Sequence, residues 1–519
     1  MVRGTPKRGG TLAVALDWEV DSIDPPASFG GWNTARVVQQ MFESLVEDDL
    51  EDEASPYTRL VPTLAEQYDV SPDGLVYTFC LRKNVRFHDG TPFDAAAVVF
   101  NFDRMLRQEA PQFSPIAADY NQVAIQSVED VRALDAHTVE IILREPFPEF
   151  LRCMTQEDAP GSIVFISPTA LKAYGNEGIA DHAPGTGPFQ FAERFPTPYG
   201  SGVKIVRNED YWGGAPYLDG IRFTPLPSAG DRAQALLDGE VDFAYGPEPM
   251  RLEELREKGF IVSEGPIPYV WYFIFNTRDR PFCDARVRRA IMCAFDRQRL
   301  SDTIFDGATD RMAGILPPAS PSYEADFPEL YPYDPARAKA LLAEAGYPDG
   351  FAFTIVTATA GSAQLAPIQI CQSMARDLAD IGVRVTIEGR EDWVSYCEEW
   401  RLGMPEGVGL SEMSWGMSCD VWIEQVAHTR YLSPKGFNAG YYSRTEFDRL
   451  LDSARTEPSK KRRTELYRKA HRLIMEDAAL LPVVTVRTGM VAYAPHVKSF
   501  KFPRQNWHDF KRVWIDRGD

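Results

Sequence analysis

The residue types that most often perform chemistry in proteins are present in this chain, but they do not form catalytic or metal-binding motifs. The seven histidines are isolated, and no two stand at the spacing of a metal-binding helix. The seven cysteines are scattered without a Cys-x-x-Cys pair, which argues against a structural zinc site or a thioredoxin-type redox centre. The sequence also lacks a G-x-S-x-G nucleophile elbow, a P-loop and an H-E-x-x-H helix. We therefore expect no metal, no cofactor and no catalytic residue.

Carboxylates are the abundant chemical group. Asp and Glu number 75 against 55 Lys and Arg, which gives a formal net charge of -20 at pH 7. A surface of this sign repels phosphate backbones and anionic lipid headgroups, so we expect no nucleic-acid partner. No apolar run approaches the roughly 20 residues that span a bilayer, so we also expect no membrane insertion. The two carboxylates of a glycosidase can come from distant segments, so a hydrolase stays an open alternative.

The hydrophobic pattern predicts a mixed α/β protein with two or three domains, because strand-like and helix-like segments alternate along 519 residues. Residues 11–16 read as a buried strand, and residues 33–45 show an apolar face at helical spacing. Asp94 is expected to cap a helix, and Asp334-Pro335 to open another that stops at Gly346. Residues 241–245 follow Asp238-Gly239 as a further strand.

Several ordered blocks carry a more specific signal. They include GGTLAVALDWEVDSIDP, LVPTLAEQYDVSPDGLVYTFCLRKNVRFHDGTPFDAAAVVFNFDRML, APGTGPFQF, VRNEDYWGGAPYLDGIRF and YDPARAKALLAEAGYPDGF. In these blocks, and in their order, the chain resembles the extracytoplasmic solute-binding proteins of bacterial ABC importers, family 5, the dipeptide, oligopeptide and nickel type. The resemblance runs from residue 9 over nearly the whole chain.

The resemblance implies a two-lobed periplasmic-binding-protein fold with an extra third domain and a ligand cleft between the lobes. We expect the first lobe to comprise residues 1–45, 166–260 and 481–519, the extra domain residues 46–165, and the second lobe residues 261–480.

The implied function is capture of a small polar solute by hinge closure and its delivery to an ABC permease in the inner membrane, without catalysis. The chain begins with basic residues but no long apolar core, so it shows no intact signal peptide. With this family, we expect a periplasmic monomer whose signal peptide has been removed. A periplasmic hydrolase and a ligand-presenting sensor component remain the alternatives.

The resemblance also points to candidate ligand-binding residues in four segments. Trp415 is the leading candidate, because it matches a tryptophan that this family places at the ligand wall; the alternative for each aromatic residue is ordinary core packing. The full set is Trp18, Trp32, Asn33, Tyr269, Trp271, Arg390, Trp393, Trp415, Met417, Ser418 and Asp420.

One departure from the family bears on the ligand. Peptide binders that resemble this chain carry an aspartate three residues after that tryptophan, where it pairs with the peptide ammonium. Here the position is Ser418, and Asp420 lies two residues further on. Either Asp420 pairs with the ammonium group of a peptide, or the ligand is hydroxyl-rich, such as an oligosaccharide or an opine-like sugar conjugate. A nickel chelate is less favoured, because only His428 lies near these segments.

Overall fold

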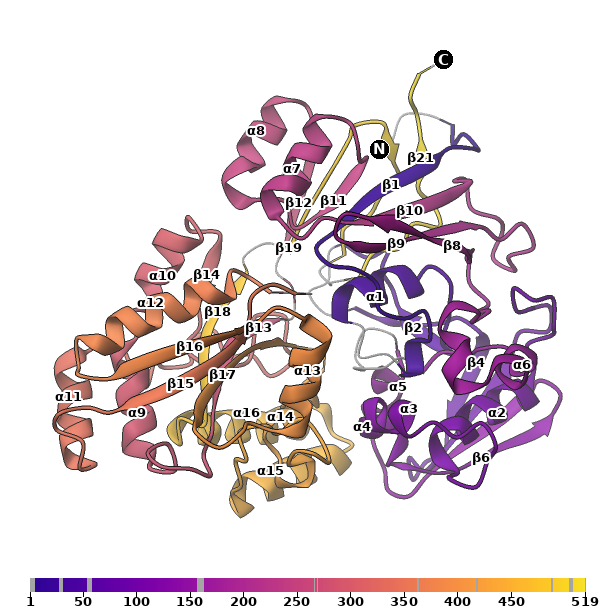
Figure 1. Cartoon of the computed structure of the whole chain (residues 1–519). Helices are drawn as coiled ribbons and strands as arrows, with labels where there is room; N and C mark the ends of the chain where they lie inside the picture. Colours follow the sequence, from indigo (N-terminus) through magenta and orange to yellow (C-terminus); the bar gives the residue numbers. More distant parts are fainter. Residues whose placement is uncertain are drawn as a thin grey trace. The chain divides into compact units, whose positions relative to one another are not determined.

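The computed structural model describes residues 5–27, 31–53, 58–155, 163–265, 267, 269–361, 364–416, 419–486, 489–503 and 507–518. The chain divides into two compact units (Figure 1). The first unit comprises Met1–Gly265 and Gly489–Asp519, and the second comprises Pro266–Thr488.

A seven-stranded sheet of order β12-β19-β11-β1-β10-β9-β8 forms the centre of the first unit. Strand β1 pairs in parallel with β10 and β11, whereas the remaining pairs are antiparallel. Leu12, Val14 and Leu16 of β1 lie in the main core, and Ala15 packs in a second core with α7. Both faces of this strand are therefore covered, as predicted from its apolar run. The strands are β1 (Thr11–Leu16), β8 (Phe189–Thr197), β9 (Gly200–Arg207), β10 (Gly220–Pro225), β11 (Phe243–Tyr245), β12 (Ile261–Gly265) and β19 (Gly489–Tyr493).

A separate four-stranded sheet of order β4-β5-β7-β6 lies in the same unit, and α2 packs against β6 and β7. Asp94 caps α2 as predicted, since its side chain accepts a hydrogen bond from the Ala97 amide at 2.9 Å. Arg104 of α2 makes a buried bidentate pair with Asp24, at 2.8 and 2.6 Å. This pair ties the α2 region to the loop that follows β1. The sheet contains β4 (Ala65–Val70), β5 (Val76–Leu81), β6 (Val128–Asp135) and β7 (Thr138–Leu143); two short pairs are β2 (Val46–Asp48) with β3 (Leu60–Pro62), and β20 (Val497–Lys498) with β21 (Trp514–Ile515).

The α-helices of the first unit are α1 (Gly31–Val38), α2 (Ala95–Leu106), α3 (Pro115–Tyr120), α4 (Gln122–Ile125), α5 (Phe150–Cys153), α6 (Pro168–Gly178), α7 (Ala229–Leu237) and α8 (Leu252–Glu257). Short 3-10 turns cover Pro25–Ala27, Ile179–Asp181 and Pro249–Arg251. Helix α1 ends at Val38, well before the residue 45 expected from its apolar pattern. The reason is tertiary: the carbonyls of Gln40 and Met41 accept hydrogen bonds from the amides of Phe189 and Gly187 instead of continuing the helix.

The second unit is built on a six-stranded sheet of order β14-β18-β13-β17-β15-β16. Strands β13 and β17 are buried along their whole length. Strand β18 pairs with β13, so residues 481–486 lie in the second unit and the expected boundary at residue 480 falls inside a strand. The strands are β13 (Val270–Phe275), β14 (Thr309–Arg311), β15 (Ala352–Ala358), β16 (Arg384–Arg390), β17 (Val408–Trp415) and β18 (Leu480–Val486).

The α-helices of the second unit are α9 (Ala285–Ala294), α10 (Arg297–Ile304), α11 (Pro335–Glu344), α12 (Pro367–Ala379), α13 (Trp393–Leu402), α14 (Trp422–Ala427), α15 (Thr445–Thr456) and α16 (Lys460–Glu476), with a 3-10 turn at Thr429–Tyr431. Asp334 caps α11 and Pro335 occupies its first turn, as predicted. Helices α12 and α13 both pack against β15 and β16.

Candidate ligand-binding site

Strand register decides which candidate residues of the second unit share a surface. In the antiparallel pair β13–β17, Trp271 lies opposite Ser414 and Val270 lies opposite Trp415. Because side chains alternate between the faces of a sheet, Trp271 and Trp415 point to opposite faces. The two tryptophans therefore do not share one surface of the sheet, and the ligand role of each stays a prediction.

Trp415 lies in an aromatic cluster on its face of the sheet. Its ring stacks on Trp400 of α13 at 5.5 Å between centroids and contacts Phe437 at 5.3 Å. Only 7% of its surface is exposed. Trp415 therefore packs in the core of the second unit. Its role as a ligand contact stays a prediction.

Asp420 is also buried, and two hydroxyl groups bind its carboxylate. One carboxylate oxygen accepts a hydrogen bond from Ser320 and the other from Ser322. These bonds join the segment after β17 to the loop before α11. The neighbouring candidates Met417 and Ser418 lie outside the described residues.

Arg390 ends β16 and is bound by acidic side chains. Its guanidinium donates to both carboxylate oxygens of Glu399, at 2.7 and 2.9 Å, and to Glu388 at 3.3 Å. The bonds to Glu399 are the main cause of the raised pKa of Arg390. A ligand carboxylate would have to compete with Glu399 for this group.

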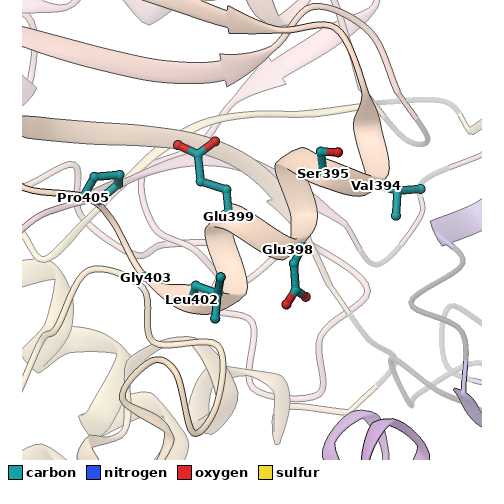
Figure 2. Close-up of a pocket in the computed structure, with 7 residues that line it drawn as sticks. All are labelled: Val394, Ser395, Glu398, Glu399, Leu402, Gly403 and Pro405. Carbon is teal, nitrogen blue, oxygen red and sulfur yellow. The ribbon is translucent and has the colours of Figure 1, made fainter.

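Glu399 also lines a pocket along α13, which Figure 2 shows. The pocket has a volume of about 640 Å³, and its other lining residues are Val394, Ser395, Glu398, Leu402, Gly403 and Pro405. Val394 and Leu402 are about half exposed, at 49% and 52%. Trp393 is buried instead, because its ring packs on Gly361, where a Cβ atom would lie 2.4 Å from the ring.

Tyr269 and Trp271 are neighbours, with ring centroids 5.9 Å apart. Tyr269 is partly exposed, whereas Trp271 is 1% exposed. The Tyr269 carbonyl accepts a hydrogen bond from Thr485 of β18 at 2.8 Å. Of this pair, only Tyr269 presents substantial surface.

Glu412 of β17 is a residue that sequence reasoning missed. It is fully buried on the same sheet face as Trp271, and Thr357 donates to its Oε2 at 3.3 Å. Its Oε1 has no hydrogen-bond partner in the described part of the chain. Burial raises the pKa of Glu412 to about 8, against the smaller opposite effect of Thr357. The available signal was a glutamate inside the otherwise apolar and small-residue run VGLSEMSW.

In the first unit, the candidates lie on the loop after β1 and on α1. Trp18 is partly exposed, and the side chain of Trp32 lies outside the described part. The neighbouring Asp17 pairs with Arg36 of α1 at 3.1 Å. Asn33, one helical turn before Arg36, is fully buried. The structure therefore groups Asn33 with Arg36, which the sequence did not single out.

Among the residues that the structure describes, no group of three or more His, Cys, Asp or Glu side chains is arranged to hold a metal ion. Within the same residues, no helix combines the length and apolarity needed to cross a membrane.

Comparison with known proteins shows the family to which this chain belongs. Residues 59–418 match the bacterial extracellular solute-binding proteins, family 5 (middle region). The chain belongs to this family, whose members bind small solutes for ABC importers, work with membrane permeases and are not enzymes.

The similar proteins include glutathione-binding proteins and a structure solved with a bound peptide. The glutathione-binding protein GsiB of Salmonella typhimurium is 33% identical over 428 residues, 81% of this chain and 80% of that protein. The Pectobacterium atrosepticum GsiB is 33% identical over 436 residues, 83% of this chain and 81% of that protein. DppA of Helicobacter pylori, solved with the peptide STSA, is 27% identical with a TM-score of 0.86, over 98% of this chain and 99% of that one. This likeness confirms the periplasmic-binding-protein fold.

Proposed function

We propose that this protein is the periplasmic substrate-binding component of an ABC importer for short peptides or peptide-like acids. It acts as a monomer, captures its solute by hinge closure and delivers it to a permease in the inner membrane. The observation that carries the proposal is the 33% identity with a glutathione-binding protein over 81% of the chain. Glutathione is a peptide-like acid, and the solved relative DppA holds a peptide.

The surroundings of Asp420 bear on the choice among peptides, oligosaccharides and opine-like conjugates. Its two oxygens accept hydrogen bonds from Ser320 and Ser322, so a ligand ammonium would have to share this carboxylate with two hydroxyl groups. We therefore assign Asp420 a positioning role in the second unit rather than the role of a dedicated ammonium partner. Opine-binding proteins share this fold at 22–23% identity, which keeps opine-like acids among the compounds to test.

A thermal-shift panel tests the proposal. Reduced glutathione, Met-Leu, a neutral trisaccharide and mannopinic acid would each be added to ligand-free protein. A true ligand at a hundredfold excess over its Kd stabilises the folded state by ~2.7 kcal/mol, which is a shift of a few degrees in a chain of this size. Mass spectrometry of the recovered compound separates binding from hydrolysis. A panel without any shift, or a ligand returned cleaved, would count against the proposal.

A further inference from the structure

Two buried side chains of the first unit present polar atoms without partners. Asn33 is 0% exposed, and neither its Nδ2 nor its Oδ1 has a hydrogen-bond partner in the described part of the chain. His508 is 3% exposed, and its Nε2 is likewise without a partner there. Buried polar groups are nearly always hydrogen-bonded in folded proteins, so three such atoms in one region require an explanation.

The two residues belong to one structural neighbourhood. Asn33 lies one helical turn before Arg36 in α1, and Gln40 lies in the turn that follows the helix. The Gln40 side chain donates to the Arg36 carbonyl at 3.2 Å and to the His508 carbonyl at 2.8 Å. Its Oε1 accepts from the Phe510 amide at 3.1 Å. These bonds hold the segment around His508 beside the carbonyl of Arg36 and the turn that follows α1.

The surroundings of His508 determine what its ring can offer. Its Nδ1 lies 3.3 Å from the hydroxyl of Tyr245, whose pKa is raised by burial, so the hydroxyl keeps its proton. Burial, and next the charge of Arg36, lower the pKa of His508 well below its usual value. A neutral ring can accept the Tyr245 proton at Nδ1, and in that tautomer its own hydrogen lies on Nε2. In this tautomer the partnerless Nε2 is a donor.

Positive charge accumulates beside this donor. The guanidinium of Arg36 lies over the Tyr245 ring at 3.9 Å and pairs with Asp17. Arg232 is also buried, and its guanidinium donates to the carbonyls of Leu226, Pro227 and Gly246. Burial lowers the pKa of Arg232 to about 10, with Asp17 opposing and Arg36 reinforcing the shift. The guanidinium groups of Arg36 and Arg232 thus lie close enough to influence each other, and the carboxylate of Asp17 offsets part of their positive charge.

We propose that Asn33, Arg36 and His508 form a subsite for a carboxylate group of the solute. The Asn33 amide and His508 Nε2 donate to the carboxylate oxygens, and Arg36, with Arg232 behind it, supplies positive charge. Donors and cations dominate the site, which suits an anion and disfavours an ammonium group. The inference rests on the proposed function and narrows its ligand to acids.

Isothermal titration with matched acid and amide probes tests the subsite. The probes are reduced glutathione against its glycine amide, and Met-Leu against Met-Leu amide. We expect the acid of a bound pair to bind at least about tenfold more tightly than its amide, since hydrogen bonds to a charged group are stronger than those to a neutral one. Asn33→Ala and His508→Phe should each reduce that ratio toward one. His182→Phe, a histidine on the exposed surface of the same unit, is the matched control and should leave the ratio unchanged.

The outcomes separate the two proposals. Acid and amide binding equally to the wild-type protein would overturn the subsite and leave solute binding intact. Variants that lose acid and amide affinity in equal proportion would show that Asn33 and His508 act only in folding. If neither pair binds and the wider panel gives no thermal shift, the proposed function fails and the subsite fails with it.

Discussion

Glu412 shows how one buried carboxyl group couples the stability of this protein to pH. Burial raises the pKa of Glu412 in the folded state to about 8, whereas glutamate in an unfolded chain ionises near its ordinary pKa of 4.5. Between these values unfolding releases a proton, so the free energy of unfolding falls as pH rises from about 4.5 to about 8. Below pH 4.5 Glu412 is protonated in both the folded and the unfolded state, and the free energy of unfolding carries no penalty from its burial.

Glu412→Gln should therefore stabilise the protein at alkaline pH. An amide keeps the shape without ionising, so the gain is on the order of 4 kcal/mol at pH 8 and close to zero at pH 4.5. Thermal unfolding at both pH values measures it. Glu257→Gln, at an exposed position of α8, provides the control. Equal midpoints for Glu412→Gln and the wild type at pH 8 would contradict the assigned pKa.

Trp415→Ala separates the packing role of this residue from its predicted ligand role. Loss of the buried ring from the cluster with Trp400 and Phe437 should cost roughly 3–5 kcal/mol of stability. Calorimetric unfolding measures this cost, and titration of the folded variant with glutathione measures binding. A ligand contact would also lower affinity by more than ~1 kcal/mol. Unchanged affinity together with reduced stability would assign Trp415 to the core alone.

At the scale of elements, the sequence predicted the features that neighbouring residues determine, but not those that distant contacts determine. Strand β1, the Asp94 cap and the start of α11 are set by patterns within a few residues, and the structure has them where expected. The end of α1 is set by amides that are almost 150 residues away in the chain. The register between β13 and β17, which are distant in the chain, sets the opposite orientations of Trp271 and Trp415. The same register sets the surroundings of Glu412. No sequence motif marked His508, because its hydrogen-bond partners come from the turn after α1 and from β11.

The close approach of residue 187 to the end of α1 offers a test of that tertiary arrangement. A Cβ atom on Gly187 would lie 2.6 Å from the carbonyl carbon of Met41, so Gly187→Ala must displace backbone. We expect a loss of roughly 1–3 kcal/mol of stability, the usual cost of overpacking. Urea denaturation measures it. Gly178→Ala, whose Cβ would make only a 3.4 Å side-chain contact, is the control; a harmless Gly187→Ala would contradict the described contact.

At the scale of the whole molecule, hinge closure predicts a more compact particle with ligand than without it. Ligand contacts favour the closed state only by the difference in affinity between the two states. X-ray scattering should therefore show a smaller radius of gyration at saturating glutathione, or at saturation with whichever panel compound gives a thermal shift. An unchanged radius for a ligand that binds tightly would contradict hinge closure while leaving binding itself in place.

We propose above all that this protein binds a peptide-like acid and returns it unchanged. Isothermal titration of ligand-free protein with reduced glutathione and with Met-Leu, followed by mass spectrometry of the released compound, tests it most directly. The account predicts saturable one-to-one binding of at least one of these acids and recovery of the intact compound. No binding of either acid, together with tight binding of a neutral oligosaccharide or conversion of the added compound, would contradict it.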